Sequence, residues 1–328
     1  MRWSIFLLTG VVVLVACSPS LRKDKPVQPI RDYERMIVGR LDADYVGNDQ
    51  CLAKCHAHDK KKTDFDNSVH GEQIDADSGL PLVNCESCHG PGSLAVAAFR
   101  IREDGQPMCQ YDKLIDLDEL PAQAQSLTCL KCHSANSSAN LALWGSSTHA
   151  TSEVSCFNCH KLHTGVQQKL DRHDMAETCY SCHPNIRSQF SQSSHHPVNE
   201  HKMDCSACHD PHGTMNNSLL REATIKATCT RCHMEYQGPF VYEHADVTED
   251  CTNCHNPHGS PNNPLLNQGM PFLCLQCHAG HSAGTYSARG TLSTTSMKQV
   301  FFNRCTDCHA AIHGTDVPSP HGRGTFIR

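Results

Sequence analysis

The apolar residues of this chain are concentrated in one run near its N-terminus. The segment IFLLTGVVVLV (residues 5–15) is almost entirely apolar, and no other segment is long and apolar enough to cross a bilayer as a helix. The run has only 11 residues, which is short for a membrane span, and Arg2 precedes it. A positive residue followed by a short apolar stretch is typical of an export signal.

The export segment ends in LVAC (residues 14–17), which resembles the lipobox of bacterial lipoproteins. The resemblance implies that residues 1–16 are removed as a signal peptide and that Cys17 becomes the lipidated first residue. Ser18 follows, and the same resemblance favours sorting to the outer membrane, because Asp at this position is the usual signal for inner-membrane retention. The alternative is an ordinary cleaved signal in which Cys17 is incidental.

The pattern after the export segment is polar and broken into short pieces. Residues 17–47 are rich in charge and proline, which predicts a flexible tether. Two later segments, residues 92–104 and 113–127, have apolar positions suited to short helices. We expect Ser93 to cap the first and Pro121 to interrupt the second.

Composition indicates that side chains alone do not build a large core. The chain has 328 residues, of which 22 are cysteine and 24 are histidine, and only 6% are aromatic. Hydrophobic residues make up 38%, and setting the cysteines aside leaves roughly three in ten, which is thin for this length. Something other than side chains should therefore fill the interior. The net charge of −6, without a long basic stripe, argues against nucleic-acid binding.

The cysteines follow a repeated pattern. Nine segments have the form C-x-x-C-H, which is the attachment signal of c-type haem. Positions i, i+3 and i+4 share one face of a helical turn, so both thiols can bond the haem while the histidine binds the iron from the same side. The nine motifs are Cys85/Cys88/His89, Cys129/Cys132/His133, Cys156/Cys159/His160, Cys179/Cys182/His183, Cys205/Cys208/His209, Cys229/Cys232/His233, Cys251/Cys254/His255, Cys274/Cys277/His278 and Cys305/Cys308/His309.

A tenth motif, CLAKCH (residues 51–56), has one extra residue between its cysteines. Cys51 and Cys55 are still on one helical face, so we expect both to attach a tenth haem, with His56 as the iron ligand. Ten haems use 20 cysteines and the lipid uses Cys17. Cys109 is left over, as a buried or unreactive thiol or as one partner of an intermolecular disulfide.

Three alternatives to haem attachment are less consistent with the sequence. Zinc ribbons use C-x-x-C in two pairs for each metal and do not need an adjacent histidine every time. Thioredoxin-like proteins use one C-x-x-C on an α/β fold. A disulfide framework, which export would permit, gives no reason for a histidine after every second cysteine.

The ten motif histidines leave fourteen others. A second histidine on the far side of each iron would make a low-spin electron carrier with no open position for substrate. His258 follows His255 by only three residues, so we expect it to bind the next haem along rather than the same one. Recurring contexts give ten candidates for the distal ligands: His70, His149, His163, His195 (or its neighbour His196), His212, His244, His258, His281, His313 and His321. The spare histidines are His58, His173, His201 and one of the 195/196 pair.

A repeat is visible between residues 144 and 278. Each unit has an aromatic residue, a histidine, one C-x-x-C-H motif followed by a further histidine, and a second C-x-x-C-H motif. The units run from Trp144 to His183, from Phe190 to His233 and from Phe240 to His278. With so few residues for each haem, we predict a mostly irregular, elongated fold with short α-helices, a haem-filled core and almost no β-sheet, over residues 48–328.

The segment GPFVYEH (238–244) with CTNCHNPHG (251–259), the ending CTDCHAAIHG (305–314) and the count of ten motifs resemble the periplasmic decahaem cytochromes of the MtrA/DmsE type, over residues 45–328. The resemblance implies an elongated chain of haems, each with two histidine ligands. Relatives pass electrons from the periplasm through an outer-membrane β-barrel to extracellular cytochromes and acceptors such as metal oxides, or serve an exported dimethyl sulfoxide reductase. This sequence departs from the family in its first motif and in its lipobox, since the relatives are usually soluble.

The leading hypothesis is an electron conduit, without catalytic residues, that carries electrons by hopping between the periplasm and the outer membrane. Its expected partners are an outer-membrane β-barrel porin, periplasmic and extracellular multihaem cytochromes, and the membrane through the lipid on Cys17. The protein would then lie at the outer membrane, mainly on the periplasmic side. One alternative is a lipid-tethered periplasmic relay to a separate reductase. The other is a multihaem reductase with one open haem site, although the C-x-x-C-K motif that often marks such a site is absent.

Overall fold

The computed structural model of the protein describes residues 40–57, 59–79, 82–133, 141–164, 171–216, 218–278, 304–307 and 309–318. Several expectations from the sequence lie outside these residues. They concern the signal peptide, the lipid on Cys17, the tether up to residue 39, and the site residues His281, Cys308 and His321.

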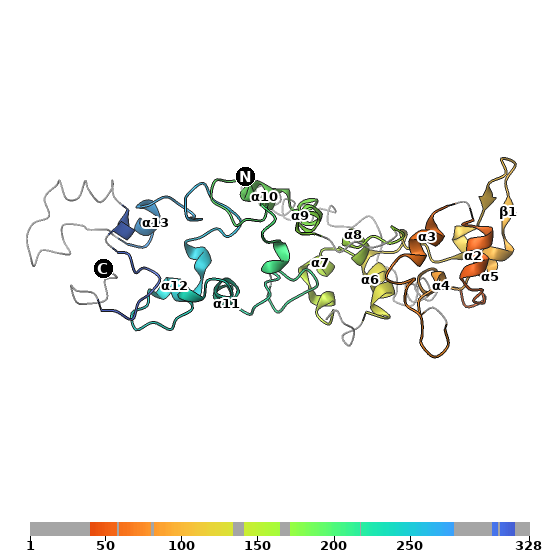
Figure 1. Ribbon diagram of the computed structural model, residues 1–328, viewed down its shortest axis with the longest axis horizontal. Coiled ribbons are helices and arrows are strands. Elements are labelled where there is room, and N and C mark those ends of the chain that lie inside the picture. The colour runs from red at the N-terminus through yellow and green to blue at the C-terminus, as the bar shows by residue number, and fades with distance from the viewer. Residues whose placement is uncertain are drawn as a thin grey trace, which may run out of the picture. The chain divides into compact units, whose positions relative to one another are not determined.

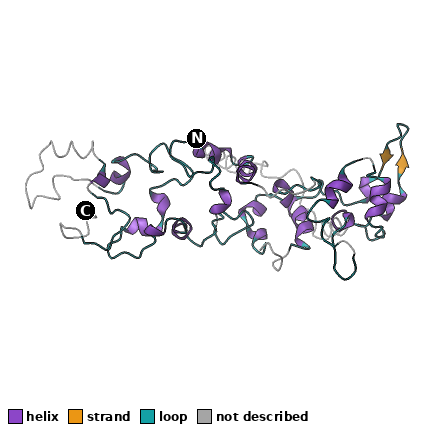
Figure 2. Cartoon of the chain, in the orientation of Figure 1, coloured by secondary structure: helices purple, strands orange, loops and turns teal. Residues whose placement is uncertain are grey.

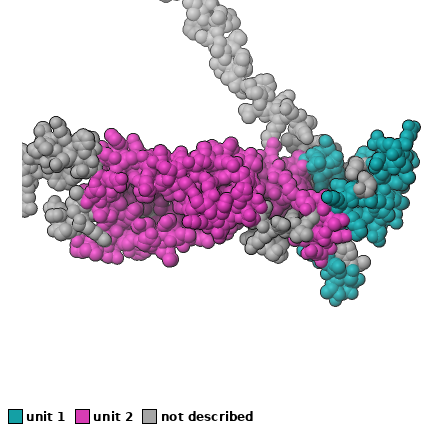
Figure 3. Space-filling model, turned by 45° about the horizontal axis from the view of Figure 1, so that its top comes forward, with its two compact units in different colours: residues 1–62, 73–120 teal, residues 63–72, 121–328 magenta. Residues whose placement is uncertain are grey.

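The chain divides into two compact units, which Figure 3 distinguishes by colour. Unit 1 comprises Met1–Lys62 and Gln73–Leu120, and unit 2 comprises Thr63–Glu72 and Pro121–Arg328. Helix α3 (Lys61–Asp66) runs across the sequence boundary between them. The first two haem motifs belong to unit 1, and the other eight belong to unit 2.

Unit 1 is built from three short helices, one 3₁₀ turn and one small hairpin (Figure 1). The hairpin pairs its two strands antiparallel, with Arg100 opposite Met108 and Ile101 opposite Pro107. The elements are α2 (Asn48–Lys54), α4 (Cys85–His89), α5 (Ser93–Ala97), β1 (Arg100–Ile101), β2 (Pro107–Met108) and η2 (Tyr111–Lys113).

Unit 2 consists of short helices and 3₁₀ turns joined by loops, and the helices run along the unit from α6 to α13, with α8 lying between α6 and α7 (Figure 1). The α-helices are α6 (Ala122–Leu130), α7 (Thr148–Thr151), α8 (Cys156–Cys159), α9 (Arg172–Tyr180), α10 (Pro184–Phe190), α11 (Ile225–Thr230), α12 (Ala245–Glu249) and α13 (Phe272–Leu275). The 3₁₀ turns are η3 (Trp144–Ser146), η4 (Cys205–Ala207), η5 (Met234–Tyr236), η6 (Cys251–Asn253) and η8 (Cys305–Asp307).

The predicted fold class is confirmed: within the described ranges the longest helices have nine residues, and the two-stranded β1–β2 hairpin is the one sheet (Figure 2). None of the helices in this part of the chain has the length and apolarity that crossing a membrane would require. The sequence made two local predictions, that Ser93 caps a helix and that Pro121 interrupts one. Ser93 is the first residue of α5 rather than its cap, which is Gly92, and α6 begins directly after Pro121.

Two kinds of haem motif alternate along the chain. The motifs are numbered here in sequence order, so that residues 51–56 form the first and residues 305–309 the tenth. In the first, third, fifth, seventh and ninth motifs, the first cysteine lies within a helix, as Cys179 does near the end of α9. In the other five, the first cysteine is the first residue of the helical turn. A polar residue can then cap the turn: Asp204 and Asp250, for example, accept hydrogen bonds from the N–H groups of Ser206 and Thr252.

Side-chain packing supplies only a small core. A cluster of four buried residues, Ala176, Tyr180, Phe190 and Val198, is extended by the partly buried Ile186 and Met203. The other buried hydrophobic residues in the described chain are scattered among the repeats. The thin core agrees with the expectation that another group fills the interior.

Glycines that follow the distal histidines allow close backbone packing. A Cβ atom on Gly71, Gly213 or Gly259 would collide with the backbone carbonyl group of Phe65, Leu143 or Gln189, respectively. Gly314 lies in the same way against the ring of Phe240. These four HG dipeptides therefore pass directly against a segment at or next to an aromatic residue from an earlier part of the chain.

Gly259→Ala should destabilise unit 2, because the new methyl group overlaps the Gln189 carbonyl and forces the two segments apart. Overpacking of this kind costs about 1–3 kcal/mol. The matched control is Gly145→Ala, where no atom lies within 4 Å of the added Cβ. Thermal unfolding followed by circular dichroism should show a lower midpoint for the first variant alone. Equal midpoints would contradict this account of the HG dipeptide.

Candidate haem-binding sites

Each motif holds its first cysteine and its histidine in a fixed relation. In eight of the C-x-x-C-H motifs, the backbone N–H of the histidine donates to the carbonyl oxygen of the first cysteine at 2.8–3.1 Å, as His255 does to Cys251. This bond closes one helical turn, so the thiol and the imidazole lie on the same side of the backbone. That is the arrangement needed to attach a haem and bind its iron from one face.

The first cysteines of neighbouring motifs meet in pairs that share a hydrogen bond. In the Cys179–Cys205 pair, for example, this bond lowers the pKa of Cys205 to about 7 and raises the pKa of Cys179. A hydrogen bond between two thiol groups therefore links each odd-numbered motif to the even-numbered motif that follows it. The five pairs are Cys51–Cys85, Cys129–Cys156, Cys179–Cys205, Cys229–Cys251 and Cys274–Cys305.

The second cysteines make the complementary connections. Burial is the main cause that raises the pKa of Cys159, Cys208 and Cys254, and a neighbouring second cysteine raises it further. The three electrostatic pairs are Cys159–Cys182, Cys208–Cys232 and Cys254–Cys277. They relate the fourth, sixth and eighth motifs to the fifth, seventh and ninth. Together with the pairs of first cysteines, they indicate that the eight motifs of unit 2 follow one another in sequence order.

Cys88 is the second cysteine of the second motif, which belongs to unit 1. It lies in α4 between Cys85 and His89, and its side chain is half-buried and not in a disulfide. Its helical position suits thioether attachment, so the assignment of Cys88 to the second haem stays a prediction that rests on the motif.

Seven motif histidines each face a second histidine, with ring centres 5.8–6.3 Å apart. The partners come from distant segments, so the chain itself brings them together. The pairs are His133–His70, His160–His212, His183–His149, His209–His258, His233–His196, His255–His313 and His278–His244.

The spacing of these rings fits two ligands on one iron. An imidazole nitrogen binds a metal at about 2.0 Å, and the ring centre lies roughly 1.1 Å behind the nitrogen, so two rings on one iron have centres about 6.2 Å apart. The angle between the ring planes varies from 13° to 62°, which is compatible with shared ligation because both planes can contain the nitrogen–iron–nitrogen axis. The donor set therefore fits haem iron with two axial histidines.

Two rules describe which motif each partner histidine faces. A histidine that follows an even-numbered motif faces the even-numbered motif before it: His258, which follows His255, faces His209. A histidine that precedes an even-numbered motif faces the next odd-numbered motif, as His244 faces His278. The sequence predicted that His258 binds the next haem along rather than that of His255. His258 does face a different motif, but that motif is the one two positions back, which contains His209.

Backbone carbonyls orient several of the paired histidines. The Nδ1 atoms of His149 and His196 lie 3.0 and 2.6 Å from the carbonyl oxygens of Pro211 and Pro257. A hydrogen bond from Nδ1–H to a carbonyl leaves Nε2 free to bind iron and fixes the plane of the ring. These prolines stand in DPHG and NPHG, so each such segment supplies one ligand and orients another. The sequence shows the recurrence of proline but not this second role.

The geometry favours His196 over His195, which was the residue named from the sequence. The ring of His196 faces His233, whereas both ring nitrogens of His195 are engaged, by the Gln192 carbonyl and by Glu200 at 2.9 Å. The Glu200 carboxylate raises the pKa of His195, which favours the protonated form that cannot bind a metal. Adjacent histidines in a strand-like segment point to opposite sides, and the sequence alone did not indicate which side faces the motif.

Burial lowers the pKa of several paired histidines. For His70, His160, His258 and His313 burial is the main cause, and the facing histidine contributes in the same direction. The neutral imidazole is therefore favoured, and this is the form that binds iron.

The first motif departs from the prediction. Cys55 forms a disulfide with Cys109, with the two Cα atoms 6.0 Å apart. A sulfur atom in a disulfide is not available for a thioether bond, so the structure contradicts the assignment of Cys55 to haem attachment and that of Cys109 to a free thiol. Cys51 still pairs with Cys85 as the first cysteines of the other motifs do.

The other predicted ligands among the described residues are His56, His89, His163 and His309. His56 contacts Asp59 through Nδ1 at 2.7 Å. Of the spare histidines, His173 and His201 contact each other at the surface, with ring centres 5.1 Å apart.

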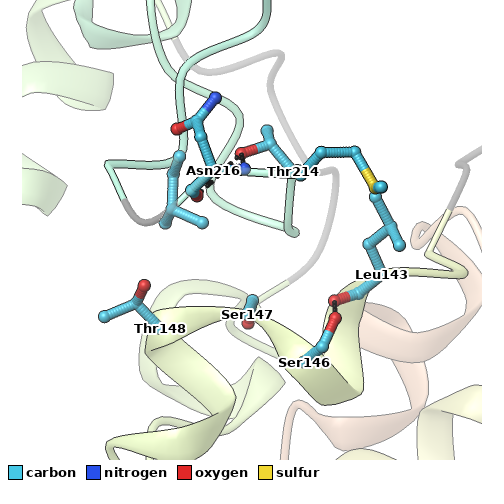
Figure 4. Close-up of a pocket in the computed structure, with 8 residues that line it drawn as sticks. Leu143, Ser146, Ser147, Thr148, Thr214 and Asn216 are labelled. Atoms are coloured by element: carbon cyan, nitrogen blue, oxygen red, sulfur yellow. Dashed lines mark hydrogen bonds between the residues drawn. The ribbon is translucent and has the colours of Figure 1, made fainter. Parts of the chain in front are cut away.

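A pocket of about 220 Å³ lies between η3–α7 and the loop after His212 (Figure 4). Its lining includes Ser146, Ser147 and Thr148 on one side and Thr214 and Asn216 on the other. Thr148 adjoins the ligand candidate His149, and Thr214 is two residues beyond His212. The lining thus contains near neighbours in sequence of two ligand candidates but no histidine.

Comparison with known proteins agrees with this geometry. A family model described as the doubled CXXCH motif matches residues 148–188, 195–238 and 244–283, which follow the three repeats. A second model, cytochrome c554 and c-prime, matches residues 101–161. The multiheme cytochrome MtrA of Shewanella baltica (strain OS185) is 36% identical over 277 residues, which cover 83% of this chain and 80% of the relative.

The chain therefore binds haem c covalently through C-x-x-C-H motifs. Proteins of this type transfer electrons and are not enzymes, in agreement with the paired histidines. The chain belongs to the MtrA-type multihaem c-type cytochromes.

Proposed function

We propose that the chain binds ten haem c groups, attached by the nine C-x-x-C-H motifs and by Cys51. The motif histidines are the proximal ligands. The distal ligands include the seven histidines that face them, and we assign His163, His281 and His321 to the three other haems. The observation that carries the proposal is the recurrence of one histidine spacing, 5.8–6.3 Å, in seven motifs. Haem c, when bound, supplies a one-electron iron couple at each position.

The chain's own residues determine the path. Contacts between first cysteines and between second cysteines alternate from Cys129 to Cys305, so neighbouring sites follow the order of the sequence. Two histidines at each iron exclude substrate, which makes the sites electron carriers. The main-chain carbonyls at Pro211 and Pro257 stabilise the ligand orientation and thereby tune the iron.

We further propose that the protein is an outer-membrane lipoprotein, on the periplasmic side, that feeds a porin–cytochrome conduit. Electrons would enter from periplasmic cytochromes and leave through a β-barrel toward extracellular cytochromes. Support comes from the export segment with its lipobox and from the relation to a cytochrome named MtrA. A tethered relay to a periplasmic reductase is the alternative that the following experiments separate.

His196→Ala should convert one haem per molecule from low spin to high spin, because it removes one of the two iron ligands while the thioether bonds keep the haem in place. Electron paramagnetic resonance measures this directly. The matched control is His195→Ala, which should leave all haems low spin. The reverse result, with the high-spin signal in the His195 variant alone, would contradict the ligand assignment.

Cys17→Ser should move the protein from the outer-membrane fraction to the soluble periplasmic fraction, because it removes the lipid attachment site while residues 5–15 remain to direct export. Fractionation with detection by haem staining tests this. Ser18→Ala is a suitable control and should stay with the membrane. Membrane retention of the Cys17 variant would show that the lipid is not the anchor.

Affinity purification of the protein from detergent-solubilised outer membranes should retain a β-barrel protein in a 1:1 ratio, identified by mass spectrometry. The Cys17→Ser variant separates a specific complex from simple co-residence in the membrane, since a barrel that binds the haem domain should still be retained. Loss of the barrel from the haem-loaded wild-type protein would contradict the conduit and favour the periplasmic relay.

A further inference from the structure

Two irregularities of the sequence meet in unit 1. The first motif has one residue too many between its cysteines, and Cys109 belongs to no motif. The structure joins Cys55 of this motif to Cys109, across 54 residues of chain. The Cα–Cα distance of 6.0 Å is typical of disulfides.

The backbone of the first motif accommodates the extra residue without displacing Cys51 or His56. The N–H of His56 donates to the carbonyl oxygen of Cys51 at 3.1 Å, the same bond that the other motifs make with one residue fewer. The N–H of Cys55 also donates to the Cys51 carbonyl, at 2.9 Å. The helix therefore widens by one residue at its end. Cys51 and His56 keep the relation that haem attachment needs, and Cys55 is the residue in excess.

Helix α2 is held in register with the second motif. The buried carboxylate of Glu86, which is 3% exposed, accepts hydrogen bonds from the N–H groups of Val46 and Gly47 just before α2. Asn48 in α2 accepts in turn from the N–H of Cys85. These bonds bring the thiols of Cys51 and Cys85 together, as in the four other pairs of first cysteines.

The hairpin places Cys109 next to the end of α2. Strand β2 ends at Met108, so Cys109 follows directly, and Gly105 at positive φ (79°) allows the tight turn between the strands. Beyond η2, the N–H of Ile115 donates to the carbonyl of His89 at 2.8 Å, which fixes the returning chain to the second motif. The long segment without haem motifs thus has a role at the first one.

We propose that the first haem is attached through a single thioether, at Cys51, with His56 as its iron ligand, while Cys55 is held in an intrachain disulfide with Cys109. The inference rests on the proposed function in that it assumes a haem at residues 51–56. One vinyl group of this haem would remain intact, which distinguishes it chemically from haems attached twice.

The two covalent steps balance without a further cofactor. The Cys51 thiol adds across one vinyl double bond: the sulfur–carbon bond forms, the thiol hydrogen passes to the other vinyl carbon, and no electrons are gained or lost. The Cys55 and Cys109 thiols give two electrons and two protons to a protein disulfide of the oxidising compartment, which becomes a dithiol.

Trypsin separates the alternatives, because Lys54 lies between Cys51 and Cys55. The haem-loaded protein is denatured, blocked with N-ethylmaleimide, digested without reductant and analysed by mass spectrometry. The expected products are residues 41–54 carrying one haem, and residues 55–60 linked to residues 103–113 without haem. Reduction should separate the linked peptides.

The third motif is a matched internal control, since Lys131 lies between Cys129 and Cys132. A haem attached twice should hold the peptide of residues 114–131 to the peptide that begins at Cys132, with or without reductant.

Each other outcome overturns the proposal and identifies what failed. A haem that bridges residues 41–54 and 55–60, with maleimide on Cys109, would exclude the disulfide and leave ten haems. A haem-free peptide of residues 41–54 would refute both the single thioether and the count of ten. Maleimide on Cys55 before reduction would refute the disulfide while leaving the Cys51 thioether.

Discussion

The structure depends on one geometric constraint: seven motif histidines each face a second histidine with ring centres 5.8–6.3 Å apart, close to the separation of about 6.2 Å that two ligands of one iron would have. No two histidines of one CHxxH segment can satisfy it for the same iron. The partner must come from another segment, so the chain has to return to each haem from a distant part of the sequence. This requirement sets the length of the loops, the positions of the HG dipeptides and the contacts between repeats. The first cysteine of every motif lies in a short helical element.

Because two motif types alternate, the chain can meet this constraint with its motifs arranged in sequence order. Motifs at the start of a helical turn and motifs near the end of a helix pair through a hydrogen bond between their first cysteines. In unit 2, successive pairs are related by an electrostatic interaction between second cysteines. The histidine after an even-numbered motif reaches back two motifs, while the histidine before it reaches forward one. Each segment therefore supports several sites. A substitution in one HG dipeptide should affect packing and ligation together, because Gly259 and His258 are adjacent.

Much of this was predictable from the sequence, and the exceptions have physical reasons. Spacing alone predicted the haem motifs, the short helices and the near absence of sheet, since C-x-x-C-H needs only one turn. It did not distinguish His195 from His196, because that choice depends on which side chain Glu200 engages. It also did not predict that Cys109 joins Cys55, since the β1–β2 hairpin that brings them together is two residues wide on each strand and has no clear periodic signal. The partners of the distal histidines depended on contacts between repeats.

The most direct test of the central claim is an electron cryo-microscopy structure of the haem-loaded protein at a resolution that shows the iron ligands. The account predicts that His209 and His258, and equally His233 and His196, share one iron, and that the irons from Cys129 to Cys305 follow the order of the sequence. Irons ligated by other histidine pairs, or neighbouring irons out of sequence order, would contradict it.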